Sequence, residues 1–224
     1  MAKEKMKKLY TLGEEITNSI THGIGSLLSI TALVIMIVVS AMHHNTIGVV
    51  TSTIFGASLI ILYTMSTLYH AITNKKAKKI LRLFDHCTIY LLIAGTYTPY
   101  TLVALRSIDP TKAWIIFGIV WGIAIFGTIF YLVFKNKFKI LNVVSYIVMG
   151  WVVLLALPEV ISYFEINNAM PGLYLLAAGG IAYTVGVIFY ALHNLNLRYF
   201  HSIWHLFVLG GSICHFLSVT LYIL

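Results

Sequence analysis

The stretch FHSIWHLFVLGGSICHFLSVTLYIL, residues 200–224, is an apolar segment that carries histidines near its start. It is long enough to cross a membrane as a helix, since about 20 apolar residues span the hydrocarbon core. His201 and His205 lie near its start, and an α-helix places residues four apart on one face, one turn from each other. A hydrogen-bonding side chain inside a bilayer is costly without a partner. The pair therefore predicts a third group, most simply a metal ion, whose other ligands come from elsewhere in the chain.

The composition is that of a polytopic membrane protein. Hydrophobic residues make up 59% of the 224 residues and charged residues only 10%, and the mean hydropathy is +0.90, values that a soluble domain of this size does not reach. The net charge of +8 raises the alternative of nucleic-acid binding. We expect no nucleic-acid partner, because the basic residues lie between the apolar segments and form a topology signal. Cys87 and Cys214 lie within apolar segments and are expected to be small buried residues without a disulfide.

Seven apolar segments predict an all-α fold, a seven-transmembrane-helix bundle that forms a single domain over residues 1–224. The expected spans are approximately residues 17–41, 47–72, 83–104, 112–134, 141–158, 172–193 and 201–223. The fifth is expected to end at Pro158, because proline interrupts a helix. The run after Ile16 is too long for a signal peptide, so we expect the first span to be retained.

The lysines and arginines predict the orientation, because cytoplasmic connections carry the excess of both. Thirteen lie in the N-terminal segment and in the second, fourth and sixth connections, whereas Arg106 and Lys112 lie on the opposite side. We therefore expect a plasma-membrane protein with a cytoplasmic N-terminus and an extracytoplasmic C-terminus, the reverse of a G-protein-coupled receptor. Close helix contacts are expected at the G-x-x-x-G pair Gly118 and Gly122 and at Gly210-Gly211.

Histidines and a carboxylate converge at one membrane depth in this arrangement. His70 lies in the last turn of the second span with Ser66 one turn earlier, and Asp85 opens the third span. Together with His201 and His205 they lie at the cytoplasmic leaflet. Three imidazoles are a frequent set of catalytic zinc ligands that leaves one position open, and a nearby carboxylate can orient or deprotonate water there. The residues alone leave open a second possibility, in which Asp85 is the fourth ligand of a structural zinc.

The other histidines are expected to have supporting parts. His86 follows Asp85 but is turned about 100° away on a helix, so a packing or supporting role is favoured over ligation. His215 lies about 15 Å along the helix axis from His205, too far to share a metal, and is expected to be a hydrogen-bonded core residue. His22 could line the site, although interfacial packing is favoured. Surface or interfacial positions are expected for His43, His44 and His193.

Three motifs in fixed order resemble the signature of the hemolysin III proteins, the bacterial branch of the progestin and adipoQ receptor family. They are Ser66-x-x-x-His70, Asp85 followed by Gly95-Thr96-Tyr97-Thr98-Pro99, and His201-x-x-x-His205. The resemblance implies a seven-helix bundle with zinc at the cytoplasmic leaflet, held at the positions of His70, His201 and His205, with Asp85 contacting a water at the metal. It also implies kinship with membrane hydrolases that include alkaline ceramidases.

Three functions are compatible with this pattern. The first is zinc-dependent hydrolysis of a lipid amide or ester drawn from the membrane, with Asp85 as the base and the Ser66 hydroxyl orienting a ligand or stabilising charge. The second is a sensor or receptor in which zinc ties helices together without turnover. The third is a cytolytic pore, which we disfavour because no charged residue lies near the middle of any expected span.

Overall fold

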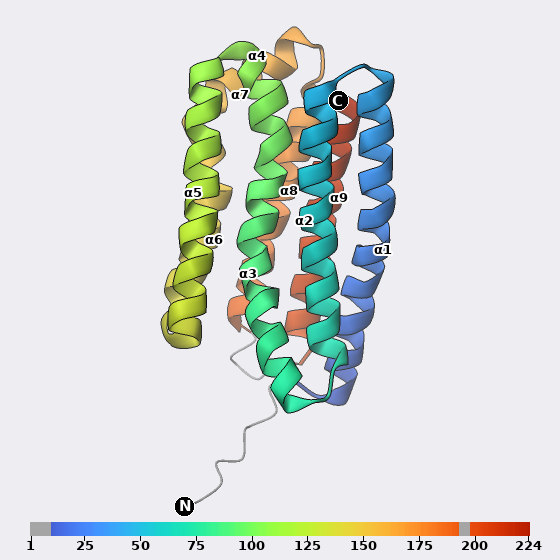
Figure 1. Cartoon of the computed structure of the whole chain (residues 1–224), viewed down its shortest axis with the longest axis vertical. Coiled ribbons are helices and arrows are strands. Elements are labelled where there is room, and N and C mark those ends of the chain that lie inside the picture. Colours follow the sequence, from blue (N-terminus) through green and yellow to red (C-terminus); the bar gives the residue numbers. More distant parts are fainter. Residues whose placement is uncertain (1–9, 193–197) are drawn as a thin grey trace, which may run out of the picture.

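The computed structural model describes residues 10–192 and 198–224, which form an all-helical bundle (Figure 1). Seven helical rods among these residues are long and apolar enough to cross a membrane, as predicted. The elements in chain order are α1 (Leu12–Met42), α2 (Thr46–Ala71), α3 (Lys75–Pro99), the π-helical segment η1 (Tyr100–Leu105), α4 (Arg106–Ile108), α5 (Pro110–Phe134), η2 (Lys135–Phe138), α6 (Lys139–Gly150), η3 (Val152–Ala156), α7 (Leu157–Ile166), α8 (Met170–Leu192) and α9 (Phe200–Tyr222).

Polar caps start the first three helices. At α1 the Glu14 backbone N–H donates to Thr11 Oγ1 at 3.3 Å while Glu14 Oε2 accepts from the Thr11 N–H at 2.8 Å, a reciprocal capping box. The side-chain oxygen of Asn45 caps α2, and that of Asn74 caps α3 by accepting from two backbone N–H groups. Because of the Asn74 cap, the basic cluster that begins at Lys75 lies in the first turns of α3 rather than in a loop.

Pro158 does not end the fifth span, contrary to the prediction. It lies in the first turn of α7, where a missing N–H removes no intrahelical hydrogen bond. The apolar rod therefore continues from Lys139 to Ile166 through the short 3₁₀ segment η3. Glu159 consequently faces the start of α5, where its carboxylate pairs with Lys112.

Close helix contact at the predicted glycines is found only in part. Added Cβ atoms at Gly118, Gly122 and Gly210 would meet nothing within 4 Å, whereas one at Gly211 would lie 3.0 Å from the Tyr183 ring. The prediction is wrong for the first three. In α5 the inward face is formed by other residues, and an apolar helix gives no sequence signal for which face that is. The buried residues of α5 are Ala113, Ile116, Val120, Ala124 and Tyr131.

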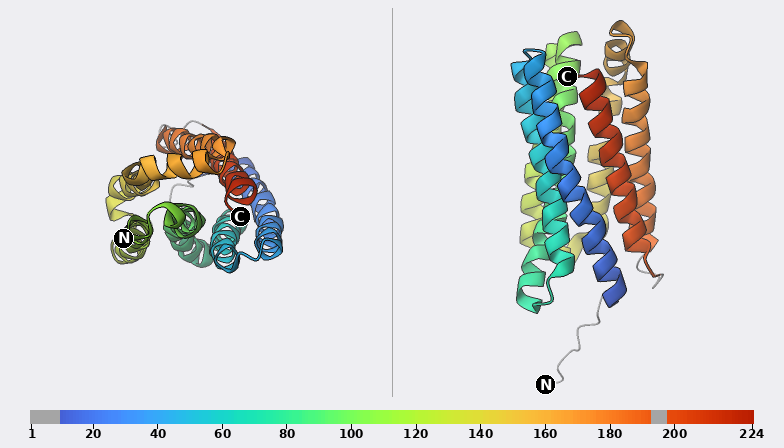
Figure 2. Two further views of the ribbon diagram at one scale, coloured as in Figure 1. Left: turned by 90° about the horizontal axis from the view of Figure 1, so that it is seen from above. Right: turned by 90° about the vertical axis from the view of Figure 1, so that its right-hand side faces the viewer.

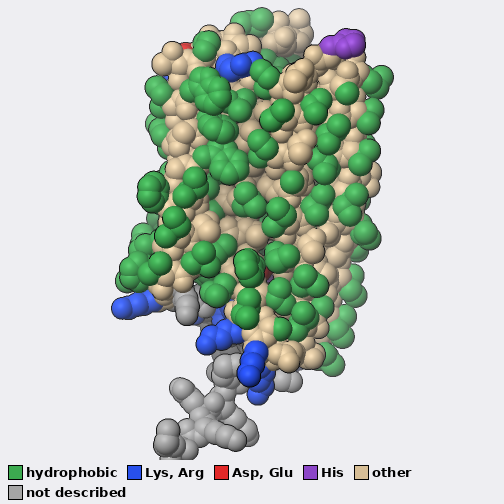
Figure 3. Space-filling view, in the orientation of Figure 1, with side chains coloured by type: hydrophobic (Ala, Val, Ile, Leu, Met, Phe, Trp, Pro, Cys, Tyr) green, Lys and Arg blue, Asp and Glu red, His purple; other side chains and the backbone are tan. Residues whose placement is uncertain are grey.

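The rods stand side by side around an oval in the end-on view of Figure 2. α1 packs against both α2 and α9, so the first and last helices are neighbours. α1 and α9 begin at the same end of the bundle, and the C-terminus lies at the other end (Figure 1). Apolar side chains cover the wall, and lysines and arginines gather at the end where α3 begins (Figure 3). This arrangement brings the last turn of α2 and the first turns of α1, α3 and α9 together.

Candidate metal centre

Three of the predicted site residues form a buried cluster at this end of the bundle. One ring nitrogen from each of His70, His201 and His205 lies within 4.8 Å of the others. The Nε2 atoms of His201 and His205 are 3.1 Å apart. The three side chains belong to residues that are only 2%, 5% and 0% exposed. The cluster could therefore hold a metal ion, because imidazole nitrogens that converge away from water are typical metal ligands.

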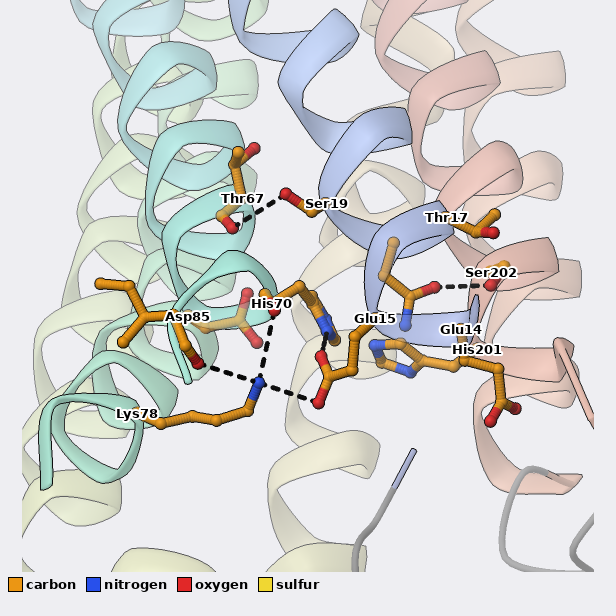
Figure 4. Close-up of polar contacts among 12 residues, drawn as sticks. Glu14, Glu15, Thr17, Ser19, Thr67, His70, Lys78, Asp85, His201 and Ser202 are labelled. Carbon is orange, nitrogen blue, oxygen red and sulfur yellow. Dashed lines mark hydrogen bonds and ion pairs between the residues drawn. The ribbon is translucent and has the colours of Figure 1, made fainter. Parts of the chain in front are cut away.

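His70 is held by a carboxylate from the first helix. Its Nδ1 lies 2.7 Å from Glu15 Oε2, and the other oxygen of Glu15 is 2.8 Å from Lys78 Nζ. Figure 4 shows Glu15 between the two partners. A carboxylate accepts the Nδ1–H, so the neutral ring carries its lone pair on Nε2. That Nε2 atom is buried and has no hydrogen-bond partner within the described ranges.

The orientation of His205 follows from a threonine on α1. His205 Nδ1 lies 3.3 Å from Thr21 Oγ1, and that hydroxyl donates its own proton to the backbone carbonyl of Thr17 at 2.9 Å. The hydroxyl therefore accepts from His205 Nδ1–H, which leaves the lone pair of His205 on Nε2. His70 Nε2 is then a lone pair without a partner in the described residues, and His205 Nε2 is a lone pair that faces His201 Nε2, so a cation among the three rings could bind both. The donor set thus fits a divalent metal such as zinc.

Two further rings of α1 and its leading segment enclose the cluster. His22 is 2% exposed and stacks on His205 with ring centroids 3.5 Å apart. The favoured interfacial placement of His22 is therefore wrong, because its helix face turns toward α9. The Tyr10 ring contacts those of His70 and His201 at 5.4 Å and 4.9 Å. Burial raises the pKa of the Tyr10 phenol well above 10, so the ring covers the cluster as a neutral group.

Hydrogen bonds between α1 and the start of α9 fix the position of His201. Ser202 Oγ donates to Asn18 Oδ1 at 2.6 Å, and the Tyr199 backbone N–H donates to Glu14 Oε1 at 2.9 Å. Tyr199 has a positive φ of 62°, which ends the preceding turn directly before the helix. Polar residues of α1 thus set the position of the helix that carries two of the three histidines.

Asp85 and Ser66 are buried residues of the consecutive helices α3 and α2. Asp85 is 8% exposed on α3, and Figure 4 shows it on the side of the site that carries His70 and Lys78. Its carboxylate is not among the ligand atoms grouped within 4.8 Å in the described part of the chain. Ser66 is buried one turn before His70 on α2. Asp85 therefore lies outside the set of three nitrogens that could hold a metal ion.

The remaining histidines divide between the two ends of the bundle. His86 turns away from the cluster, since its Nδ1 lies 2.9 Å from the Arg82 carbonyl and its ring stacks on Tyr131 at 5.3 Å. His43 is exposed, with Nδ1 3.0 Å from the Leu224 carbonyl oxygen. His193 lies outside the described residues. His215 is buried as expected, and its Nδ1 has no hydrogen-bond partner in the part of the chain that the structure describes. Cys87 and Cys214 are free, and Cys87 is buried.

An apolar cavity of about 230 Å³ lies between the helices and reaches His22, the ring that stacks on His205. His22 and Asp85 line one part of it, and Leu105 and Ile116 from η1 and α5 line another. Its wall is built mainly from apolar side chains of α3, α6, α8 and α9. A cavity of this kind, with a few polar groups at one place, is typical of a site for an apolar ligand.

Glu15 was not predicted from the sequence as a residue of the site, and His22 was expected at the interface instead of in the site. A signal was available, because Glu15, Asn18 and His22 are spaced three and four residues apart and so share one face of α1. An ionisable residue at the start of an apolar helix on that same face indicates a functional contact.

The family comparison agrees with this geometry. A model of the "Haemolysin-III related" family matches residues 10–216. The chain is 44% identical to Hemolysin-3 of Bacillus cereus, covering 99% of this chain and 97% of that protein, and 45% identical to the Hemolysin-3 homolog of Bacillus subtilis (strain 168), covering 96% of each. It is 29% identical to the human monocyte to macrophage differentiation factor, over 95% of this chain and 86% of that protein. The chain belongs to the Haemolysin-III related family, within the progestin and adipoQ receptor group.

Proposed function

We propose that this protein is a zinc-dependent hydrolase that cleaves a lipid amide or ester at the cytoplasmic leaflet. The observation that carries the proposal is the buried three-histidine cluster beside an apolar cavity that Asp85 lines. A metal centre next to an apolar cavity suits a substrate whose polar bond lies near the metal and whose tail lies among apolar side chains.

The choice of zinc rests on the donor set. Three neutral imidazoles are a typical set for catalytic zinc, and the second hydrogen bonds of His70 and His205 direct their Nε2 lone pairs toward the cluster. Zinc bound there would supply a Lewis acid that polarises a carbonyl and activates water at neutral pH.

The remaining chemistry falls to the residues beside the cluster. Asp85 would accept the proton of the attacking water and return it to the leaving group, because it is a buried carboxylate on α3 next to the cavity. The Ser66 hydroxyl would orient the ligand or stabilise developing negative charge. The apolar cavity would exclude bulk water from the tail of the substrate.

The membrane orientation is part of the proposal. The lysines and arginines of the described chain gather at the end that carries the cluster (Figure 3), which supports a cytoplasmic position for that end. The N-terminus is then cytoplasmic, the C-terminus extracytoplasmic, and the seven helices act as a single domain. In the plasma membrane, a lipid of the inner leaflet could reach the cluster laterally.

Metal-stabilised sensing is the second candidate. The histidines come from α2 and α9, and Glu15 adds α1, so a metal would tie three helices together without any reaction. Membrane lysis is suggested by the names of the Bacillus relatives alone. We disfavour a conducting pore, because such a path needs a polar lining and this cavity is bordered mainly by apolar residues.

The test compares Asp85→Asn with the wild type for release of fatty acid from a panel of ceramides and phospholipids. We expect the variant to keep its zinc and melting temperature while activity falls by about 100-fold or more, since a lost general base costs roughly 10² to 10⁴ in rate. Asp109→Asn is the matched control, because Asp109 caps α5 at the opposite end of the bundle. A zinc-loaded wild type that releases no fatty acid from any lipid would favour the sensor, and undiminished activity of Asp85→Asn would remove Asp85 as the base.

A further inference from the structure

A buried histidine lies in the cavity wall, remote from the metal centre. His215 is 5% exposed and lines the cavity from α9. It follows His205 by ten residues on the same helix, which corresponds to about 15 Å along the axis. His215 is therefore separate from the candidate metal centre, although it lines the same cavity as His22, which stacks on His205.

The protein supplies no hydrogen bond to His215 Nδ1 within the described ranges. Its ring stacks on Tyr183 at 5.5 Å, but the Tyr183 hydroxyl lies 2.8 Å from Ser212 Oγ and is engaged there. Thr184 accepts from Trp151 Nε1 at 3.1 Å and donates to the Gly180 carbonyl at 2.8 Å. The Tyr183 and Thr184 hydroxyls thus have other partners, whereas the Tyr100 hydroxyl, like His215 Nδ1, is buried without a hydrogen-bond partner among the described residues.

The space for this ring is built into the neighbouring helix. A Cβ atom added at Gly179 would lie only 2.7 Å from His215 Nε2. Any larger residue at position 179 would push the imidazole away from α8. The ring is thus closely fitted between Tyr183 and Gly179, while one of its nitrogens lacks a partner.

The wall of the cavity that faces His215 contains a π-helical segment. The π-helical segment η1 follows Pro99 and places Tyr100, Thr101 and Leu105 in the lining of the cavity. The Tyr100 ring meets the His215 ring edge-on at 6.1 Å. Pro99 has no N–H, so the regular hydrogen-bond ladder is broken there, and π-turns inside helices are frequent at functional sites.

A buried polar atom without a partner costs free energy, which a ligand can recover. A neutral imidazole has one donor and one acceptor nitrogen, so a hydroxyl group can pair with it in either tautomer. A carboxylate or an ammonium group would instead bring an unpaired charge into an apolar wall.

We propose that His215 is a specificity subsite that binds a hydroxyl group carried part-way along the apolar tail of a lipid. The ligand class is then a hydroxylated acyl lipid, with its hydroxyl about 15 Å from the end that reaches the metal centre, by the same helix-rise arithmetic. This inference rests on the proposed function only in treating the cavity as the place of the lipid tail.

The experiment measures binding and needs no turnover. Purified protein in detergent is incubated with radiolabelled stearic acid, and unlabelled stearic acid or its hydroxylated isomers compete in a scintillation proximity assay. We expect one isomer to compete about threefold to tenfold better than stearic acid, the gain typical of one hydrogen bond. His215→Phe keeps a ring beside Tyr183 and should abolish the preference, whereas His215→Gln keeps a hydrogen-bonding group and should retain part of it.

The outcomes separate this inference from the proposed function. Asp109→Asn should keep the preference, because Asp109 caps α5 and is not among the residues that line the cavity. If phenylalanine is too large for the space beside Gly179, His215→Leu removes the same hydrogen bond. Binding of stearic acid with no preferred isomer, or a preference that survives in His215→Phe, overturns the subsite alone. Absence of any stearic acid binding overturns the subsite together with the lipid site of the proposed function.

Discussion

Replacing Glu15 by alanine would test how the first helix shapes the metal centre. Glu15 receives the Nδ1–H of His70 at 2.7 Å and holds Lys78 at 2.8 Å. Without the carboxylate, the buried Nδ1–H loses its acceptor, and the ring can rotate or change tautomer. His70 would then present Nε2 to the metal for only part of the time.

The expected loss is large for zinc and small for the fold. Removing the partner of a metal-binding histidine lowers metal affinity by about 10-fold to 100-fold, which corresponds to about 1.4 to 2.7 kcal/mol. The Lys78 side chain is 26% exposed, so loss of its ion pair costs at most about 1 kcal/mol. Zinc affinity should therefore fall while the metal-free variant remains folded.

The assay is a zinc titration against a chromogenic chelator in detergent, at one fixed pH, with the melting temperature of each metal-free protein measured in parallel. Glu159→Ala is the matched control, because it removes a carboxylate paired with Lys112 at the far end of the bundle. Glu15→Gln should lie between the wild type and Glu15→Ala, since its amide oxygen can still accept from His70.

Wild-type zinc affinity in Glu15→Ala would contradict the proposed role of Glu15 in holding His70 for the metal. It would mean that His70 does not depend on Glu15 for its tautomer, or that His70 is no ligand. An equal loss of affinity in Glu159→Ala would point to general destabilisation in place of a specific contact.

Two further predictions concern the Ser66 hydroxyl and the membrane topology. Ser66→Ala should lower lipid hydrolysis by less than about tenfold, the worth of a single hydrogen bond, and a loss as large as that in Asp85→Asn would assign the hydroxyl a more direct part. A reporter fused after Leu224 should be extracytoplasmic and one inserted near Lys137 cytoplasmic, and a shared location would contradict the proposed orientation.

The number of spans and the histidine cluster could be predicted from the sequence for a physical reason. A bilayer requires long apolar helices, so hydropathy marks each rod directly. His70 and His201 then lie at one end of the bundle by topology alone, since an even-numbered span ends where an odd-numbered span begins. The computed structure brings these residues together as expected.

Which face of each helix points inward could not be predicted in the same way. Gly118 looks like a contact residue in the sequence but lies on the exposed side of α5. The helix is apolar all round, so its sequence does not indicate which face is buried. The contact between Glu15 and His70 joins residues 55 positions apart and depends on the rotation of α1 about its axis. That His215 Nδ1 has no partner among the described residues depends on side-chain positions that no sequence pattern records.

The most direct test of the metal centre is the zinc content of the purified protein, measured by elemental analysis for the wild type and for His201→Ala and His215→Ala. We expect one zinc per chain in the wild type, none in His201→Ala, and an unchanged content in His215→Ala. His215→Ala is a stringent control because both histidines are buried on α9, while His215 lies more than ten residues further along the helix. Zinc retained in His201→Ala and lost in His215→Ala, or a wild type that binds no zinc, would contradict the assignment of the three-histidine site.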